Sequence, residues 1–380
     1  MITIKKIDKA TSVYEWNAHL NSGADEILEI GVRNRDVWGM ETNQAARILL
    51  QWEKYTTPYH SASIRLFAAN VENNSISSGD NQFIQGNVIP ESWTEGSQRY
   101  YNNPQADDAT TGATWKNRVV SIPWNALGNS VATLRAGGMT QSFQYDSASP
   151  GPLFFTGSNS GSVEVNYPSN IYSKESDKWD LTMDVTVLQG LITASAVDKF
   201  SGIMLMHRPV IEKSELSVSA GPKKFFSNDT NTVYQPRLEL KYDDYSWSTG
   251  KKVIGSDQST VYYRGNSGKY DNRSTVRFRP VVRESFPTAS YSTSTQADTI
   301  KTFSAARSMY AIVDVITDEE IIGYDMTFTR VSADNDGMYF DVPLEGFSKG
   351  RLYRPVIKVL DRVAEGAVEF FDSKTHFEVV

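Results

Sequence analysis

The carboxylates of one short segment come nearest to a metal site in this chain. The segment SADNDGMYFD places Asp334, Asp336 and Asp341 around Gly337, and clustered carboxylate oxygens are the ligands that calcium prefers. However, the segment lacks the regular acid spacing and the closing glutamate of an EF-hand loop. We therefore predict an Asp-Gly turn between two strands, in which the carboxylates hold the turn backbone.

A second acidic run, Asp318, Glu319 and Glu320 in TDEEIIGYD, has the residue type that cleaves glycosides. Glycoside cleavage needs two carboxylates that face each other across one bond. Neighbouring residues on a strand point to opposite faces, and acids at a hairpin end discourage unwanted strand pairing. We predict a solvated strand end here and no catalysis.

The remaining residues with catalytic or metal-binding chemistry show no pattern. The histidines lack the His-x-His or His-x-x-x-His spacing that brings two rings to one face; they are His19, His60, His207 and His376. The absence of cysteine excludes disulfides, thiol catalysis and cysteine-bound zinc. No nucleophile elbow or zinc-protease motif occurs, and GSNSGS at 157–162 lacks the Lys-Ser/Thr ending of a phosphate loop. The sequence thus predicts a chain without catalytic residues, metal ligands or cofactors.

Aromatic residues in polar surroundings are the remaining candidates for binding. Such rings stack on sugars, but tyrosine is also abundant in protein interfaces. Both uses stay open at this stage, and no glycan-contacting residue is assigned. The candidates in Gly-, Ser- and Pro-rich segments are Tyr100, Tyr101, Tyr145, Phe154 and Phe155.

The elements that must carry these residues are strands. Aromatics make up 12% of the 380 residues, and aromatic and β-branched side chains fill pleated, half-buried surfaces. Short alternating runs bounded by turn residues predict strands at 26–32, 46–53, 61–71, 117–124, 161–167 and 236–242. Helical periodicity is weak, and we expect short helices within 124–137 and 185–196 only.

A polar stretch, KYDDYSWSTGKK, interrupts the apolar rhythm before a new set of strands begins. We therefore expect two domains, 1–250 and 251–380. The predicted strands of the second are 274–284, 309–317, 326–332, 337–344, 351–360 and 375–380. Their number and the domain length predict an immunoglobulin-like sandwich.

Charge and hydropathy limit the kinds of partner and the location that the sequence allows. The net charge of -7 is spread along the chain without a basic block, so we do not expect nucleic-acid binding, which needs clustered cations. The N-terminus lacks the apolar core of a signal peptide, and no apolar stretch approaches eighteen residues. We expect neither export through a signal peptide nor a membrane-spanning segment.

Several motifs of the first half occur in a recognisable order, beginning with NSGADEILEIG from Asn21. The later pieces are ARILLQWE, ASIRLFAAN, SWTEG at 92–96, TGATW at 111–115, WDLTMDVT, GIMLM and PRLELKY. This succession, over residues 15–245, resembles the DNRLRE domain, a jelly-roll β-sandwich related to carbohydrate-binding modules. It departs from the pattern in Gln51-Trp52 and in a long Ser- and Gly-rich stretch at 125–178.

The second half resembles the C-terminal module of virion structural proteins in T-even-like, contractile-tailed bacteriophages. The residues that carry the resemblance are VRFRPVVRESFP, MYAIVDVITDEEIIGYD, TRVSADNDGMYFDV and GRLYRPVIKVL. The resemblance implies assembly rather than chemistry, with the chain made in the host cytoplasm and incorporated into the virion.

The jelly-roll resemblance assigns Trp93 and Trp115 to turn-to-strand junctions. There a large ring closes the end of the core while its N–H finds a polar partner. The expectation from the whole sequence is a non-enzymatic phage particle protein of the neck, tail or baseplate periphery, present in several copies and docking onto other virion proteins. The alternative is a glycan-binding adhesion module that contacts a cell surface.

Overall fold

The structure is a computed structural model, and strands dominate the residues it describes. These are residues 1–37, 40–53, 55, 59–70, 83–89, 91–100, 112–124, 133–136, 139–144, 154–156, 163–166, 180–186, 201–207, 222–286, 300–360 and 368–380. Two 3-10 helices, η1 (Glu15–Asn17) and η4 (Ser256–Gln258), punctuate the strands. The chain is all-β and built from β-sandwich-type sheets, so the predicted fold class is confirmed.

The chain divides into two compact units. Residues 6–238 form the first unit, and residues 239–380 together with residues 1–5 form the second. The sequence predicts a boundary near residue 250, with the N-terminal residues in the first domain. The structure instead changes unit between Leu238 and Glu239 and assigns the first five residues to the second unit.

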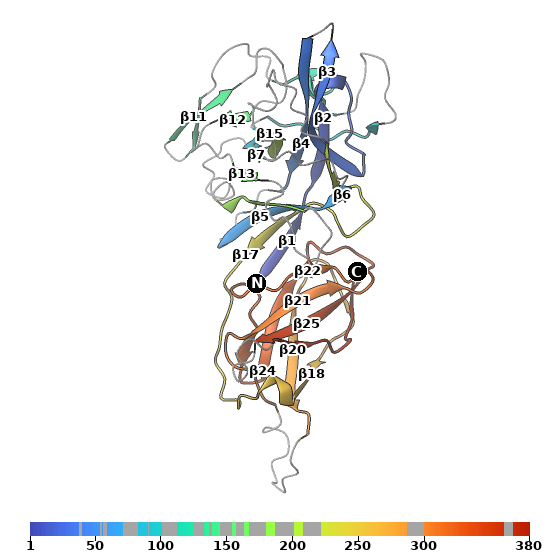
Figure 1. Cartoon of the computed structure of the whole chain (residues 1–380). Coiled ribbons are helices and arrows are strands. Elements are labelled where there is room, and N and C mark those ends of the chain that lie inside the picture. Colours follow the sequence, from blue (N-terminus) through green and yellow to red (C-terminus); the bar gives the residue numbers. More distant parts are fainter. Residues whose placement is uncertain are drawn as a thin grey trace. The chain divides into compact units, whose positions relative to one another are not determined.

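An eight-stranded sheet is the main element of the first unit. Its order is β13 (Val163–Asn166), β7 (Phe83–Val88), β15 (Ile203–His207), β4 (Met40–Gln51), β3 (Ile27–Val37), β16 (Lys223–Phe226) and β6 (Ala68–Asn70), with β2 (Lys9–Tyr14) paired to β4. Figure 1 shows β2, β3 and β4 side by side.

Smaller groups of strands complete the first unit. Strand β5 (Ser61–Leu66) pairs antiparallel with β14 (Leu181–Asp184). A three-stranded sheet contains β10 (Thr133–Ala136), β11 (Met139–Gln144) and β12 (Phe154–Thr156), and β8 (Asn117–Val119) with β9 (Ile122–Pro123) forms a hairpin.

Burial patterns explain why these segments are strands. Residues Ile48, Leu49 and Leu50 of β4 are fully buried, because a strand covered on both faces has a continuous apolar run. Strand β5 instead alternates between half-buried and buried residues, as expected of a strand with one covered face. The two periodicities visible in the sequence therefore distinguish a central strand from a half-covered one.

The second unit is a sandwich of two sheets (Figure 1). One has the order β18 (Ser259–Arg264), β20 (Thr275–Glu284), β24 (Gly337–Pro343) and β23 (Ser332–Asp334). The other has the order β19 (Lys269–Tyr270), β27 (Phe377–Val379), β25 (Leu352–Leu360), β21 (Ser308–Asp314) and β22 (Glu320–Ile322), with β26 (Val368–Phe371) paired to β25.

Aromatic rings fill the space between these two sheets. Tyr310 of β21 stacks on Phe340 of β24 with ring centroids 4.2 Å apart and an interplanar angle of 10°. The ring centroids of Phe278 of β20 and Phe377 of β27 are 5.0 Å apart. Rings contributed by facing sheets thus form the core of the second unit.

Two local predictions were wrong. The segment predicted as a strand at 326–332 is mostly a turn, because the Asp325 carboxylate accepts hydrogen bonds from the backbone N–H groups of Thr327 (2.8 Å) and Phe328 (3.0 Å). The helix predicted within 124–137 is contradicted by β10, whose residues pair antiparallel with β11. The rest of that segment, and most of the helix predicted at 185–196, lies outside the described residues.

The first residues of the chain are built into the core of the second unit. Ile2 and Ile4 of β1 (Ile2–Lys6) are 5% and 2% exposed. The backbone N–H of Tyr242 donates to the Met1 carbonyl at 2.8 Å, and Lys5 forms an ion pair with Glu345. The second unit is therefore assembled from two segments separated by the whole first unit.

We expect Ile4→Ala to destabilise the second unit selectively, by about 3 kcal/mol, through loss of buried apolar volume. Hydrogen exchange should quicken in peptides from β21 and β25 and stay unchanged in peptides from β3 and β4. The matched control is Val253→Ala, since Val253 is 61% exposed in the same unit. Faster exchange in β3 and β4 instead would contradict the assignment of the first residues to the second unit.

Candidate functional site

The buried side-chain amide of Asn21 joins the motif segments of the first unit. Its Nδ2 donates to the backbone carbonyls of Glu95 (2.7 Å) and Ala113 (2.8 Å). Its Oδ1 accepts from the backbone N–H groups of Gly23 and Gln98, both at 3.3 Å. Segments NSG, WTEG and TGATW, far apart in the sequence, therefore meet at one residue, and we call this arrangement the Asn21 hub.

Glycines let these segments approach one another. A Cβ on Gly23 would lie 2.1 Å from the carbonyl oxygen of Glu95, and a Cβ on Gly112 would lie 2.4 Å from the same atom. Gly96 has φ +90° and its Cβ would lie 2.2 Å from Asn21 Oδ1. Close packing against the Glu95 backbone thus explains Gly23 and Gly112, and a positive φ with contact to the Asn21 side chain explains Gly96.

The Glu95 side chain extends the Asn21 hub to two further segments. Its Oε1 accepts from the backbone N–H of Ala10 at 2.6 Å and from Asn228 Nδ2 at 3.0 Å. Burial raises the pKa of this carboxyl, while the hydrogen bonds from Ala10 and Asn228 oppose the rise. Glu95 therefore has the position of a structural tie, although a carboxyl with a raised pKa is also a feature of catalytic acids.

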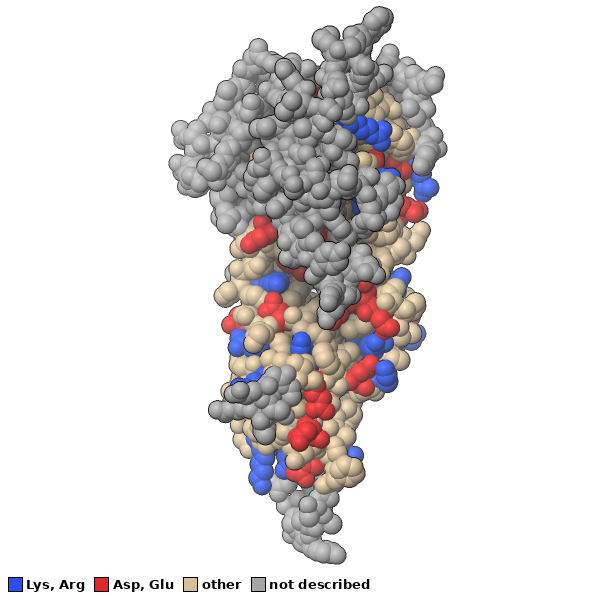
Figure 2. Space-filling view, in the orientation of Figure 1, with Lys and Arg blue, Asp and Glu red and all other residues tan. Residues whose placement is uncertain are grey.

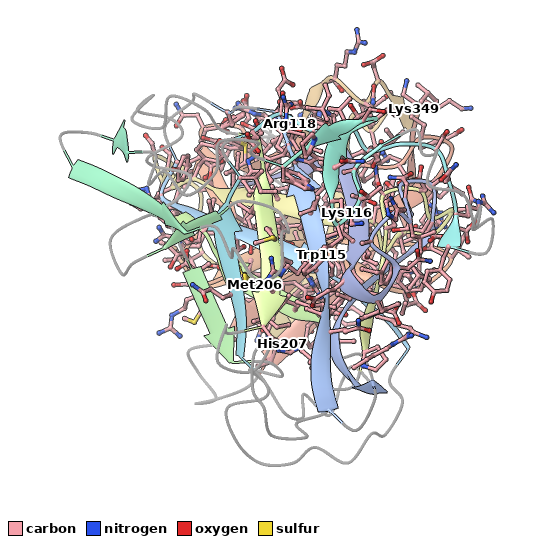
Figure 3. All side chains as sticks on the ribbon, turned by 90° about the horizontal axis from the view of Figure 1, so that it is seen from above. Trp115, Lys116, Arg118, Met206, His207 and Lys349 are labelled. Atoms are coloured by element: carbon pink, nitrogen blue, oxygen red, sulfur yellow. The ribbon has the colours of Figure 1, made fainter. Side chains whose placement is uncertain are left out.

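The tryptophans of the motif region are core residues. Trp93, Trp115 and Trp124 are each 2% exposed and belong to one cluster with residues of β4 and β15. Figure 3 shows Trp115 close to Met206 of β15, and the Arg47 guanidinium lies 4.6 Å from the Trp115 ring centroid. The predicted burial of Trp93 and Trp115 is confirmed.

The indole N–H groups of Trp93 and Trp124 also find partners. Trp93 Nε1 donates to the carbonyl of Ser201 at 2.7 Å, as predicted, and Trp124 Nε1 donates to the carbonyl of Thr114 at 2.8 Å. Trp124 was not singled out in the sequence. Its position nine residues after Trp115 was the available signal, because two buried tryptophans bracket the intervening hairpin.

The sequence-predicted aromatic candidates do not assemble into a described sugar platform. Tyr100 packs edge-on against Tyr14 with ring centroids 5.2 Å apart, so it belongs to a half-buried aromatic contact. Tyr101 and Tyr145 lie outside the described residues. Phe154 and Phe155 lie on β12, of which only the backbone is described.

The acidic segment at 334–341 forms the predicted turn. Strands β23 and β24 pair with Asp334 opposite Gly337, which has φ +122°, and the Asp334 carboxylate accepts from the backbone N–H of Asp336 at 2.9 Å. The interpretation as an Asp-Gly turn is confirmed.

Arginines of the neighbouring strand β20 engage the same acids. Arg277 makes two hydrogen bonds of 2.8 Å to Asp341, and Arg279 makes two of 3.0 and 2.8 Å to Asp334. Both guanidinium groups lie over the Tyr339 ring, at 4.3 and 5.4 Å from its centroid. The RFR and GMYFD motifs are therefore one cross-strand arrangement of arginines, acids and a ring.

The other sequence candidates lie in separate places. Asp318 has φ +57°, and its carboxylate accepts from Arg354 Nη2 at 2.6 Å, while Glu320 begins β22. The histidines lie on four different segments. Of these, His207 is buried at the end of β15 and His19 Nε2 is 3.1 Å from Lys116 Nζ.

Within the described ranges, no group of three or more His, Asp or Glu residues is arranged to hold a metal ion.

Among the helices that the structure describes, none has the length and apolar character needed to cross a membrane.

Two surface features were missed by sequence reasoning. The tip of the β8–β9 hairpin exposes Val120 (47%) and Ile122 (44%), although the sequence predicts one continuous strand over 117–124. In the second unit, the half-buried rings of Tyr245 and Trp247 stack with centroids 6.4 Å apart, and Arg330 lies 4.1 Å from the Tyr245 centroid. The alternation of large and small residues in DDYSWST was the available signal for the ring pair.

Charged side chains do not form a patch of one sign on the face drawn in Figure 2. Over its described residues, acidic and basic side chains are intermixed. This distribution agrees with the weak net charge of -7. A strong electrostatic attraction for a polyanion is therefore not a feature of this face.

Comparisons with known proteins supply no family for the chain. No protein-family model matches it, and no curated protein matches it. Among solved structures, an FMN-binding β-glucuronidase from Facaelibacterium prausnitzii L2-6 is 8% identical with a TM-score of 0.19, over 100% of this chain and 39% of that one. This chain therefore spans well under half the length of that enzyme.

A second solved structure is the adhesin domain of Epf from Streptococcus pyogenes. It is 6% identical with a TM-score of 0.16, over 97% of each chain. Both TM-scores are too low to define a shared fold, so neither similarity bears on function.

We expect Asn21→Ala to lower the free energy of unfolding of the first unit by about 3 kcal/mol, because it leaves two buried carbonyls without donors. Chemical denaturation followed by tryptophan fluorescence measures this loss, since Trp93 and Trp115 lie in the same unit. The control is Asn231→Ala, an exposed asparagine of that unit. Equal stability of the two variants would show that the Asn21 hub does not hold the motif segments.

We expect Glu95→Gln to stabilise the first unit at neutral pH, because the Gln Oε1 can accept both hydrogen bonds without a buried charge. The raised pKa of Glu95 in the folded chain means that its contribution is greatest when it is protonated and is lost as the pH rises. The difference in stability between variant and wild type should therefore grow from below pH 4 towards pH 7. Thermal melts of both proteins across this pH range measure the difference in stability. A difference that shrinks as the pH rises would contradict the prediction.

Proposed function

We propose that this chain is a non-enzymatic structural component of a contractile-tailed bacteriophage particle, at the neck, tail or baseplate periphery. It would act there by protein–protein docking through rigid β-modules. The resemblance of the second half to the C-terminal module of such virion proteins is the starting point of the proposal.

One observation carries the proposal beyond that resemblance. Several polar residues of the sequence motifs are occupied in holding the fold. Asn21 and Glu95 tie backbone segments in the first unit, and Asp334 and Asp341 are paired with arginines in the second. The described surface also exposes apolar side chains, among them Val120, Ile122 and Ile316, and such residues are used in docking.

The alternative is a glycan-binding module that contacts a cell surface. The Tyr245–Trp247 pair favours it, since stacked, half-exposed rings beside an arginine form a surface on which a sugar ring can pack. In that case the second unit would carry the binding site.

Immunogold electron microscopy of virions and host-cell fractions, with antibody raised against the whole chain, tests the proposal. We expect regular labelling at one position on the particle. Bare particles with label on cell surfaces would overturn it in favour of glycan binding, and Tyr245→Ala with Trp247→Ala should then abolish saturable oligosaccharide binding. An exposed-residue variant such as Val253→Ala is the matched control.

A further inference from the structure

The β8–β9 hairpin is held more firmly than a surface turn requires. Trp115 precedes it and Trp124 follows it, and both are buried in the core of the first unit. The backbone N–H of Trp124 donates to the Lys116 carbonyl at 3.1 Å, and that of Thr94 donates to the Arg118 carbonyl at 3.1 Å. The hairpin is thus a short, rigid projection with two large anchors.

The residues at the tip are poor turn formers. The two-residue turn between β8 and β9 is Val120–Ser121, whereas such turns favour Asn-Gly and similar pairs. Ser121 has φ +58°, a conformation that costs energy for a residue with a side chain. Residues that disfavour the turn they occupy, and that gain no packing there, are expected where a surface serves function.

The chemistry of the tip is apolar with basic flanks. Val120 and Ile122 are 47% and 44% exposed, and both would lose water contact on docking. Lys116 is exposed, and Arg118 donates to the neutral Ser92 carbonyl at 2.8 Å. Residues 112–124 contain these two cations and no acid, in a chain whose net charge is -7.

A second apolar surface, with charges of the opposite sign, lies on the second unit. In the β21–β22 connection, Ile316 is 75% exposed, and Asp318, Glu319 and Glu320 follow after Thr317. The backbone N–H of Val315 donates to the carbonyl of Leu352, which is itself 40% exposed. We call this surface, made of Ile316, Leu352 and the three acids, the acidic loop.

The acidic loop is also rigid. The Asp314 carboxylate is fully buried and accepts from the backbone N–H groups of Ile316 and Thr317, both at 2.9 Å, while Arg351 Nη1 contacts its other oxygen at 2.9 Å. The Arg351 contact and these backbone hydrogen bonds outweigh burial and lower the pKa of Asp314. A preorganised loop loses little conformational freedom when it docks.

We propose that the hairpin of one copy of this chain docks onto the acidic loop of a second copy. Val120 and Ile122 would cover Ile316 and Leu352, with Lys116 and Arg118 facing the acids. Such an interface joins two different surfaces, so repetition in one direction produces a ring or a filament, whereas reciprocal docking of two copies produces a two-fold dimer. Each contact is small, and its effect grows with the number of copies. The proposal does not rest on the proposed function.

Sedimentation velocity of the full chain over a range of concentrations tests the proposal. We expect the average mass of the wild type to rise with concentration. A hairpin variant (Val120→Ser with Ile122→Ser) and a loop variant (Ile316→Ser) should each associate about tenfold more weakly or worse, since each loses apolar contact area. Val253→Ser, at an exposed apolar residue outside both surfaces, should leave association unchanged.

A mixture of the two variants gives the decisive result. The hairpin variant keeps an intact acidic loop and the loop variant keeps an intact hairpin, so an equimolar mixture should form a one-to-one dimer that neither forms alone. A wild type that stays monomeric, a mixture without dimer, or variants that associate like the wild type would each overturn the proposal. Binding to anionic phosphatidylserine vesicles that the hairpin variant loses would also overturn it and identify a membrane as the partner. Particle labelling could succeed while association fails, or the reverse, so the two proposals fail separately.

Discussion

The first unit depends on the side-chain amide of Asn21. The segments around it are turns without long strand ladders, so their backbone carbonyls and N–H groups need partners from elsewhere. One buried amide supplies two donors and one acceptor to three such segments at once. Because an unsatisfied buried carbonyl costs more than a hydrogen bond gains, loss of this residue would release the segments together rather than singly.

The segments held by this amide also support the exposed β8–β9 hairpin. Ala113, held by Asn21, lies two residues before Trp115, and the Trp115 ring is fixed in turn against Arg47 and the residues of β15. The hairpin that exposes Val120 is therefore connected to a buried polar contact by a short and fully packed path. An apolar tip in water needs such support, since without it the side chains would turn inward.

Much of the fold was predictable because it follows from periodicity. The continuous apolar run of β4 and the alternation of β5 require no knowledge of distant residues. By contrast, the position of residues 1–5 in the second unit depends on contacts with residues more than two hundred positions away, such as Tyr242 and Glu345. Sequence patterns contain no information about such pairing.

The candidate surfaces escaped prediction for a related reason. The residues of VVSIP read as the interior of a strand, and their exposure becomes visible only when Ser121 turns the chain back. The strand predicted at 326–332 failed because an apolar rhythm says nothing of a carboxylate that satisfies the local backbone, as Asp325 does.

Both units use polar residues of their sequence motifs to hold the backbone and neighbouring strands together. In the second unit, Asp334 and Asp341 are each bound by an arginine that also covers Tyr339. Both oxygens of each carboxylate accept hydrogen bonds from that arginine. Strong charge-assisted bonds of this kind fix the outer face of a sheet, leaving its edges and turns as the places where a partner can add contacts. In the described part of the chain, polar side chains hold turns and sheets in place, while Val120, Ile122 and Ile316 remain exposed at turns. That division of roles also explains why motifs can resemble catalytic or metal-binding segments while their geometry serves the backbone.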